Sequence, residues 1–181
     1  MSRLLTTAAT LLALAAPAAA DLTPYRDRPF ADDVVYFVVT DRMANGDVSN
    51  DKGGLTGGPE QTGFDPTDIG MFHGGDFQGL AQKLDYIQGL GVTAIWVTPP
   101  VVNKVVHKYD GGLSAGYHGY WGLDFLNVDP HLGGNAAFKA FVDAAHARNI
   151  KIIMDIVVNH TGDVIQYREC DGGSMAKPCP Y

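Results

Sequence analysis

Three apolar runs along the chain have the pattern of buried β-strands. They lie at residues 34–39, 92–97 and 150–158, and their residues are mainly Val and Ile. A continuous apolar run of this length is typical of a strand whose two faces are both covered, as in a parallel sheet. We therefore predict three strands that are buried on both faces.

Two amphipathic helices are expected between these strands. Apolar residues recur at intervals of three and four over 77–87, with Asp76 placed as the N-cap and a glycine at position 89 or 91 as the stop. A second stripe at 138–145 follows Asn135, which we take as the N-cap of that helix. Each helix would lay its apolar stripe on the sheet.

Long polar segments without periodicity follow the first and second strands, at residues 41–75 and 99–134. The alternation of strands and helices predicts parallel pairing through right-handed crossovers, with functional residues gathered at the carboxyl ends of the strands. We expect an α/β fold that corresponds to about strands one to three of a (β/α)8 TIM barrel. An open doubly wound sheet is the structural alternative.

The amino terminus has the layout of a secretory signal. Arg3 precedes a Leu- and Ala-rich stretch that ends in small residues at position 20. The stretch is too short for a typical membrane span, so we expect export of the mature chain, either to the periplasm or outside the cell. In an oxidising compartment, the only two cysteines, Cys170 and Cys179, are expected to form a local disulfide.

Composition narrows the class of ligand. The chain has 181 residues, 46% of them hydrophobic, and a formal net charge of −7. This apolar content is enough for a packed core, which argues against wholesale disorder. The acidic balance, without any cluster of Lys or Arg, disfavours nucleic acid and anionic membranes as partners. We expect a monomer that binds neutral ligands or cations.

The first polar segment is rich in oxygen ligands. Asn45, Asp47, Asn50 and Asp51 lie close together, and Asp76 follows after two glycines. Calcium takes six to eight such oxygens, and a glycine-containing loop can wrap around it. The spacing does not fit an EF-hand, in which the third and twelfth positions carry ligands. A solvated, turn-rich loop remains the alternative.

Two further groups follow strands. Asp155 is an acid within the third apolar run, so its carboxylate needs a partner, and His160 lies at the carboxyl end of that run. Residues 116–122 concentrate aromatic rings between glycines, which suits stacking on a sugar ring or, alternatively, packing of the loop onto the core. Zinc binding by His118 and His160 lacks a supporting motif. The other four histidines are expected in loops or on the surface.

These motifs together resemble the family 13 glycoside hydrolases, the α-amylases and their relatives, from about Asp33 to His160. Residues 155–160 (DIVVNH) resemble the first family signature, and residues 117–121 (YHGYW) resemble the loop after the second barrel strand. The loop at 40–51 (TDRMANGDVSND), with GGDF at 74–77, is similar to the calcium loop of cyclodextrin glucanotransferases and maltogenic amylases. Residues 91–96 match the second strand.

The resemblance implies roles for the residues that would touch the sugar. His160 would hydrogen-bond the glucose unit at the cleaved position, and Tyr120 would stack beneath it. His118 and Trp121 would support that contact. Asp155 would anchor the hydrogen-bond network below the catalytic carboxylates.

The resemblance also implies calcium as a cofactor at two sites. Asn159 would ligate a calcium between the barrel and a domain inserted after the third strand, which would begin at residues 161–181. A second calcium would be held by the first polar segment, through Asn45, Asp47, Asn50, Asp51, Asp76 and the carbonyl of Gly74. Asn45 departs from the Asp that relatives carry there, which lowers the negative charge offered to the cation.

By this resemblance the protein would be an α-amylase-type glycosidase that acts on the α-glucosidic bonds of starch-like glucans with retention. Such an enzyme needs a carboxylate nucleophile and a second carboxyl group as acid/base. The family's nucleophile Asp and acid/base Glu would follow Tyr181, so we expect the chain alone to be inactive. The alternatives are a non-catalytic, calcium-stabilised glucan-binding protein and, more distantly, an exported zinc hydrolase.

Overall fold

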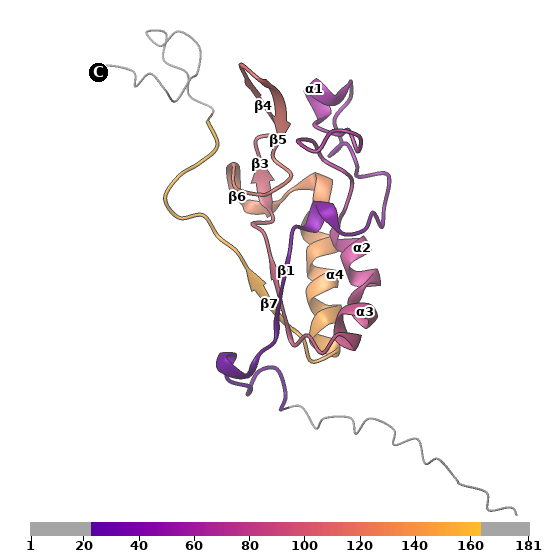
Figure 1. Cartoon of the computed structure of the whole chain (residues 1–181), viewed down its shortest axis with the longest axis vertical. Coiled ribbons are helices and arrows are strands. Elements are labelled where there is room, and N and C mark those ends of the chain that lie inside the picture. The colour runs from indigo at the N-terminus through magenta and orange to yellow at the C-terminus, as the bar shows by residue number, and fades with distance from the viewer. Residues whose placement is uncertain (1–22, 164–181) are drawn as a thin grey trace, which may run out of the picture.

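The computed structural model describes residues 23–163, and Figure 1 shows its elements. The strands are β1 (Val35–Val38), β2 (Ala94–Val97), β3 (Val101–Asn103), β4 (Val106–Tyr109), β5 (Gly112–Ala115), β6 (Gly122–Val128) and β7 (Lys151–Met154). The α-helices are α1 (Pro59–Thr62), α2 (Phe77–Gln82), α3 (Leu84–Gly89) and α4 (Gly134–Ala147). Three short 3₁₀ helices cover Phe30–Asp32, Thr40–Arg42 and Pro130–Leu132.

The central sheet has the strand order β1-β2-β7, and both pairs are parallel. Val35 pairs with Ala94, which in turn pairs with Lys151, so the strands run in sequence order across the sheet. Helices α2, α3 and α4 lie together on one side of it (Figure 1). Sequential order with helices on one face is the arrangement of a barrel wall and not of a doubly wound sheet. The barrel is not closed within residues 23–163.

The core lies between the sheet and this helical layer. The apolar positions that the helical spacing selected, Phe77, Leu80, Leu84 and Ile87, are fully buried. They pack in one cluster with residues of the strands and of α4, namely Val38, Ile95, Val97, Phe141, Ala145 and Ile150. The amphipathic pattern therefore identified the covered face of the sheet correctly.

The opposite face of the sheet is bare, so the prediction of strands buried on both faces is wrong. The exposed fractions are 40% for Val35, 51% for Phe37 and 41% for Trp96. Phe37 and Trp96 contact each other edge to face, with ring centroids 5.3 Å apart. In a closed barrel this face would look inward, where side chains from other strands would cover it.

Two helices differ from the sequence-based expectation. The predicted helix after Asp76 is interrupted at Lys83, where α2 ends and α3 begins, although its apolar spacing continues unbroken. Asp76 caps α2 as expected, because its carboxylate accepts a hydrogen bond from the N–H of Gly79. Helix α4 begins earlier than expected, with Gly133 as N-cap, and the Asn135 side chain instead accepts from the N–H of Val128.

Two strand predictions also need correction. The third strand ends at Met154 instead of residue 158, because its neighbour β2 ends at Val97 and offers no partner beyond the bond from the Asp155 N–H to the Val97 carbonyl. The segment 99–134 is not irregular: it holds β3 paired with β6 and the hairpin of β4 with β5. Both pairs lie at the carboxyl end of the central sheet (Figure 1).

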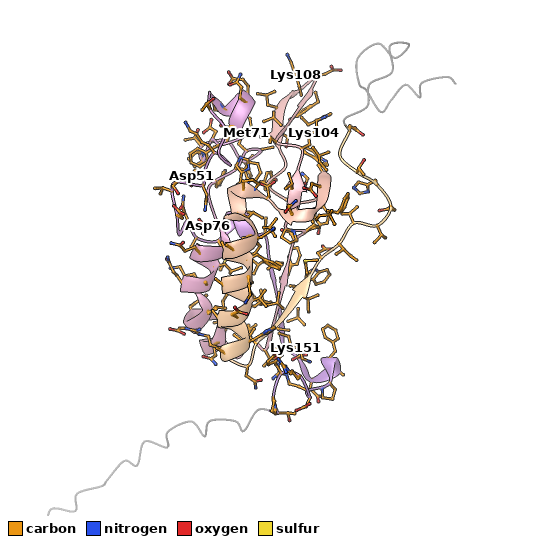
Figure 2. All side chains as sticks on the ribbon, turned by 180° about the vertical axis from the view of Figure 1, so that it is seen from behind. Asp51, Met71, Asp76, Lys104, Lys108 and Lys151 are labelled. Carbon is orange, nitrogen blue, oxygen red and sulfur yellow. The ribbon has the colours of Figure 1, made fainter. Side chains whose placement is uncertain are left out.

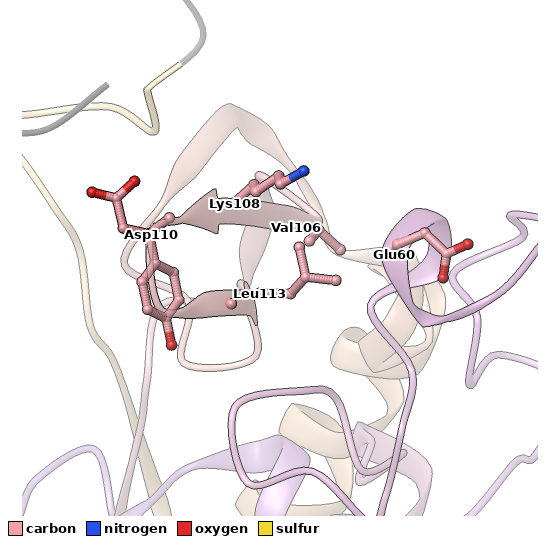
Figure 3. A pocket seen from close by; sticks show the side chains of 7 residues that line it. Glu60, Val106, Lys108, Asp110 and Leu113 are labelled. Atoms are coloured by element: carbon pink, nitrogen blue, oxygen red, sulfur yellow. The ribbon is translucent and has the colours of Figure 1, made fainter. Parts of the chain in front are cut away.

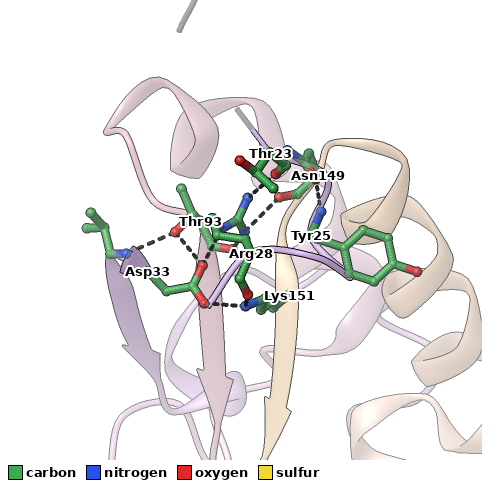
Figure 4. A network of polar contacts seen from close by, with 8 residues as sticks. Thr23, Tyr25, Arg28, Asp33, Thr93, Asn149 and Lys151 are labelled. Atoms are coloured by element: carbon green, nitrogen blue, oxygen red, sulfur yellow. Dashed lines mark hydrogen bonds and ion pairs between the residues drawn. The ribbon is translucent and has the colours of Figure 1, made fainter. Parts of the chain in front are cut away.

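The amino end of the sheet is closed by a buried polar network (Figure 4). Asp33 accepts from Arg28 Nε and Lys151 Nζ, each at 2.6 Å, and from the Thr93 hydroxyl at 2.9 Å. Arg28 also donates to the carbonyl oxygens of Thr93 and Asn149. The Asp33 side chain is 0% exposed and that of Arg28 4%, so both charges are neutralised away from water. This network joins the segment before β1 to β2 and β7.

Some expectations concern residues outside 23–163. The signal segment at 1–20, the cysteine pair Cys170 and Cys179, and most of the stretch 161–181 fall there, so they remain predictions. In the part of the chain that the structure describes, no helix is long and apolar enough to cross a membrane. Figure 2 places Lys151 at one end of the molecule and Asp51 and Asp76 toward the other.

Candidate functional site

The predicted sugar-binding residues meet where β7 ends. Tyr120 donates its hydroxyl to Asp155 Oδ2 at 2.7 Å, which supplies the partner that the acid after β7 requires. His160 Nε2 lies 2.9 Å from the carbonyl oxygen of Tyr120, and since a carbonyl only accepts, Nε2 carries the proton. The loop after β5 and the segment after β7 are thus joined by two hydrogen bonds.

Tyr120 is held as a neutral donor. Burial raises the pKa of its phenol to about 12, and the neighbouring Asp155 carboxylate acts in the same direction. An ionised phenol would repel that carboxylate, whereas the neutral hydroxyl donates to it. The ring therefore stays uncharged at neutral pH and keeps the apolar face that a sugar can stack on.

His118 is oriented by the backbone of the same loop. Its Nδ1 accepts from the N–H of Tyr120 at 3.0 Å, so the ring is neutral and carries its proton on Nε2. Burial lowers the pKa of His118, and the positive charge of Arg42 lowers it further. The His118 ring stacks near that of Tyr120 and meets the Trp121 ring edge to face, with centroids 4.6 Å apart in the second case.

The loop turns tightly at Gly119, which has a φ of +86°. A Cβ at this position would lie 2.1 Å from the carbonyl oxygen of Pro99, so only glycine allows the backbone to pass. Trp121 is fixed on the other side of the turn, because its backbone N–H donates to Asn103 Oδ1 at 2.7 Å. We call residues 117–121 the aromatic loop.

Asp76 organises residues 40–76, a stretch that contains the first polar segment and that we call the first loop. Its carboxylate is fully buried and accepts from the N–H groups of Gly46, Asp47 and Gly79 and from the side-chain amide of Asn50. These four hydrogen bonds to one carboxylate fix the loop on the start of α2. Figure 2 shows Asp76 and Asp51 in this region.

Several of the predicted calcium ligands converge beside Asp76. Asn45 Nδ2 donates to Asp51 Oδ1 at 2.6 Å, and a Cβ at Gly74 would lie 2.5 Å from the first atom and 2.7 Å from the second. The side-chain oxygen of Asn50 is buried without a hydrogen-bond partner. A buried acceptor without a donor is costly, and a cation would satisfy it.

The charges around this cluster also suit a cation. Burial raises the pKa of Asp51, the hydrogen bond from Asn45 lowers it, and the nearby negative charges of Asp76 and Asp47 raise it again. Asp47 turns one carboxylate oxygen toward Ser49, whose N–H and hydroxyl both donate to it. Among residues 23–163, no three His, Cys, Asp or Glu side chains are grouped so as to hold a metal ion, so Asp47, Asp51 and Asp76 do not form such a group by themselves. A calcium here would also need the amide and carbonyl oxygens.

Asn159, the ligand predicted for the other calcium, is not brought to this cluster by any contact. It is exposed in the segment that follows β7, and it has no hydrogen-bond partner within the part of the chain that the structure describes. Its role stays a prediction.

The sequence reasoning missed three residues that support the site. His131, expected in a loop or on the surface, is buried and stacks on Phe72 with ring centroids 4.1 Å apart. Its ring nitrogens lie 2.8 Å from Asp129 Oδ1 and 2.9 Å from the Thr62 carbonyl oxygen, so both nitrogens have a partner. Asn103, which holds Trp121, and Arg42 of the first loop were also missed.

A separate pocket of about 560 Å³ lies between α1 and the β4–β5 hairpin (Figure 3). Its lining residues are Glu60, Val106, Lys108, Tyr109, Asp110, Gly112 and Leu113. None of the predicted sugar-binding residues lines it. Glu60, the only glutamate within residues 23–163, lies in α1 and does not end a strand.

Comparisons with known proteins agree with this geometry. Residues 37–177 match the family described as "Alpha amylase, catalytic domain". An alpha-amylase of Streptomyces lividans is 50% identical over 128 residues, which are 70% of this chain and 14% of the relative. The periplasmic alpha-amylase of Escherichia coli (strain K12) is 46% identical over 134 residues, 71% of this chain and 19% of the relative.

Solved structures give the same result. The cyclomaltodextrin glucanotransferase CldA is 44% identical with a TM-score of 0.63 and covers 72% of this chain with 26% of its own. The alpha-amylase of Geobacillus thermoleovorans, crystallised with acarbose, is 38% identical with a TM-score of 0.59, over 76% of this chain and 25% of its own. The chain thus spans about a quarter or less of the length of each of these proteins.

Proposed function

Because the chain belongs to the alpha-amylase catalytic-domain family, we propose that it forms part of a (β/α)8 barrel that acts on α-glucosidic bonds of starch-like glucans. In this proposal residues 21–160 are barrel and residues 161–181 begin an inserted domain. The chain's own contribution is one side of a glucose-binding site at the carboxyl ends of β1, β2 and β7.

The observation that carries the proposal is the contact between the aromatic loop and the end of β7. The bond from the Tyr120 hydroxyl to Asp155, together with that from His160 to the Tyr120 carbonyl, fixes an aromatic face beside an imidazole. An apolar ring with neighbouring donors matches a glucose unit, which offers one apolar face and a rim of hydroxyls.

Each residue has a distinct part in binding. The Tyr120 ring would stack beneath the glucose at the cleaved position, while the Nε2–H of His118 would donate to one of its hydroxyls. His160 would contact the same sugar through its imidazole, and Trp121 would support the rings from the side. Asp155 orients Tyr120 and does not itself need to reach the substrate.

The proposed reaction retains the anomeric configuration. It would proceed through a covalent glycosyl intermediate formed by a carboxylate nucleophile, with a second carboxyl group as acid and then base. Neither role falls to the glutamate of α1, which lines the pocket of Figure 3, a pocket that Tyr120 does not line. The residues described above bind and orient the glucose unit.

We also propose that the first loop binds calcium. The candidate ligands are Asn45, Asp47, Asn50, Asp51, Asp76 and the Gly74 carbonyl, and the partnerless oxygen of Asn50 supports the assignment. A bound calcium would offset the negative charges of the loop and stiffen it. Asn159 is proposed as a ligand of a separate calcium at the barrel edge.

Export of the protein as a monomer, with a disulfide between Cys170 and Cys179, completes the proposal. Export is supported by the signal-like segment at 1–20 and by the periplasmic relative from Escherichia coli. The mass of the mature protein, measured with and without reduction, tests both the cleavage and the disulfide.

Calorimetric titration of the chain with acarbose and with maltoheptaose tests the glucan site. We expect binding in the presence of calcium, and a loss of about tenfold in affinity for Tyr120→Ala, the scale of a lost stacking contact. Tyr86→Ala is the matched control, because Tyr86 is an exposed tyrosine on α3, away from the aromatic loop. Equal affinity of both variants would contradict the proposed site.

A glucan-binding role without catalysis is the second candidate. It is favoured by one observation: the sugar-binding groups are assembled within residues 23–163, while the single glutamate there lies in a different pocket. Binding of maltoheptaose by the chain without release of reducing sugar would favour this role for the chain by itself. Hydrolysis of starch by the purified chain would exclude it.

A further inference from the structure

Arg42 occupies the space between the first loop and the aromatic loop. One of its terminal nitrogens donates to Asp41 Oδ2 at 2.6 Å and to the Met71 carbonyl at 2.9 Å, and the other donates to the Ile69 carbonyl at 2.7 Å. The guanidinium is therefore fixed on three sides by the first loop. Its side chain is 24% exposed, so its charge is only partly screened by water.

The free face of the guanidinium covers the ring of Tyr117. The Arg42 Cζ lies 3.8 Å from the centre of that ring, a close cation–π contact. Tyr117 in turn meets His118 edge to face, with ring centroids 5.2 Å apart. One side chain of the first loop thus packs against the residue at which the aromatic loop begins.

The Asp41 carboxylate orients Arg42 from below. It is buried and also accepts from the N–H groups of His73 and Gly74, so it holds the turn that leads into α2. A Cβ at Gly75 would lie 2.4 Å from the carbonyl oxygens of Thr40 and Asp41, so only glycine lets the chain pass this close to them. The guanidinium is therefore held against Tyr117 by a closely packed, hydrogen-bonded turn.

We propose that Arg42 is a positioning residue for the aromatic loop: by stacking on Tyr117 from a fixed base, it keeps His118 a neutral donor through Nε2. The inference rests on the proposed glucan function, since that N–H is the group that a sugar hydroxyl would accept from. Within residues 23–163, His118 Nε2 has no hydrogen-bond partner of its own.

The charges around His118 support this role. Arg42 faces it from the first loop, and from the aromatic loop it meets only the neutral side chains of Tyr117, Tyr120 and Trp121. Asp155 is separated from it by the Tyr120 hydroxyl. Burial and the positive charge of Arg42 both lower the pKa of His118, so no neighbouring group favours the imidazolium.

The first test needs neither a variant at Arg42 nor a glucan. Nitrogen-15 NMR of the full chain, with the His118 signals assigned by their loss in His118→Gln, reports the protonation of each ring nitrogen. We expect an unprotonated Nδ1 and a protonated Nε2 at neutral pH. An imidazolium, or a proton on Nδ1, would overturn the proposal.

The second test separates the effect of the positive charge of Arg42 from that of its planar stack on Tyr117. In Arg42→Gln, which loses the charge and the stack, we expect His118 to titrate at a higher pH, and acarbose affinity at neutral pH to fall by about tenfold, the scale of a partly buried cation–π pair. Arg42→Lys should restore the titration of His118 but only part of the affinity, because an ammonium cannot reproduce the planar stack. Unchanged His118 titration in Arg42→Gln would contradict the proposal.

Arg148→Gln is the matched control. Arg148 pairs with Asp85 on the helical side of the molecule, away from both loops, so neither His118 titration nor acarbose affinity should change. If the wild-type chain does not bind acarbose while His118 still responds to Arg42, the proposed function fails and the positioning role stands. If acarbose binds but the titration of His118 does not respond to Arg42, the positioning role fails and the proposed function stands.

Discussion

The two ends of the same three-stranded sheet differ in whether their polar groups have partners within the chain. At the amino end, Asp33 accepts from two cations and a hydroxyl, so the three charges of Asp33, Arg28 and Lys151 are all paired. At the carboxyl end, the side-chain oxygen of Asn50 has no partner and the Nε2 of His118 is open. The closed end holds the strands in register, while the open end keeps groups available for a ligand, as is usual for barrel proteins.

The carboxylates of the two ends differ in the same way. Burial alone would raise the pKa of Asp33, but hydrogen bonds from Lys151, Arg28 and Thr93 outweigh it and hold that pKa below its usual value. Burial prevails at Asp41 and Asp51, whose pKa values are raised. Ionisation therefore stabilises the fold at the amino end and costs stability at the carboxyl end.

The largest expected effect is at the amino end. Asp33→Ala would leave the ammonium of Lys151 and the guanidinium of Arg28 without their common partner, in a place that water barely reaches. We expect a loss of about 3 to 5 kcal/mol in the free energy of unfolding, the usual cost of breaking one side of a buried ion pair. Urea unfolding, followed by circular dichroism, measures it.

Asp143→Ala is the control for that loss. Asp143 forms an exposed pair with Lys139 on α4, and exposed pairs contribute little. We expect its unfolding curve to overlay that of the wild type. Similar losses for Asp33→Ala and Asp143→Ala would mean that the amino end is no more rigidly held than the surface.

Calcium should act only at the open end. A ligand at about a hundred times its dissociation constant stabilises the folded state by about 2.7 kcal/mol, so the unfolding midpoint should rise with calcium and fall with a chelator. Asp51→Asn should remove most of this rise. Asp85→Asn, which changes an exposed acid on α3, should retain it, and a loss in both variants would exclude the first loop as the site.

Tyr120→Phe tests the contact between the aromatic loop and β7. The variant loses the hydroxyl that donates to Asp155 but keeps the stacking ring. We expect the free energy of unfolding to fall by roughly 1.5 kcal/mol, the lower range for a hydrogen bond to a charged group. Because the ring can still stack, the acarbose affinity should fall by less than the tenfold loss of Tyr120→Ala. Urea unfolding and titration calorimetry measure the two effects, and Tyr86→Phe serves as the control.

The smallest expected effect is the pH dependence of the contribution that Asp33 makes to the free energy of unfolding. Its folded pKa lies below the unfolded value of about 3.9, so its stabilising contribution is complete above that pH and is lost as the pH falls through the folded pKa. The pKa of Asp41 is raised in the folded state, so its contribution has the opposite sign: the folded state loses stability as the pH rises through that pKa. Unfolding free energies between about pH 6 and 3 should fall less steeply in Asp33→Asn than in the wild type.

Much of the central fold could be predicted from the sequence. The runs that became β1 and β2, and the stripe from Phe77 to Ile87, identified the parallel strands and the helical face, because burial imposes a period on the residues. The bare face of Phe37 and Trp96 could not be predicted, because a strand sequence shows that a face is apolar but not whether it is covered.

The second polar segment was misjudged for a different reason. In β4 and β5, glycine and charged residues obscure any alternation, and pairing such as that of Val106 with Ala115 arises from the tertiary fold. In the candidate site, the motif at 117–121 selected Tyr120 and His118, which the structure places with their rings stacked. Arg42 was missed because a single arginine in a polar loop carries no pattern, and only the structure places it on Tyr117.

The residues of the amino-end network are far apart in the sequence, so they are synthesised at different times. Arg28 and Asp33 are made early, whereas Lys151 is 118 residues beyond Asp33 in the chain. At about 5 to 20 residues per second, roughly 6 to 24 seconds of synthesis separate the carboxylate from its ammonium partner. During that interval the network at the amino end of β1 lacks one of its two cations. It can be completed only when β7, which begins with Lys151, has been synthesised.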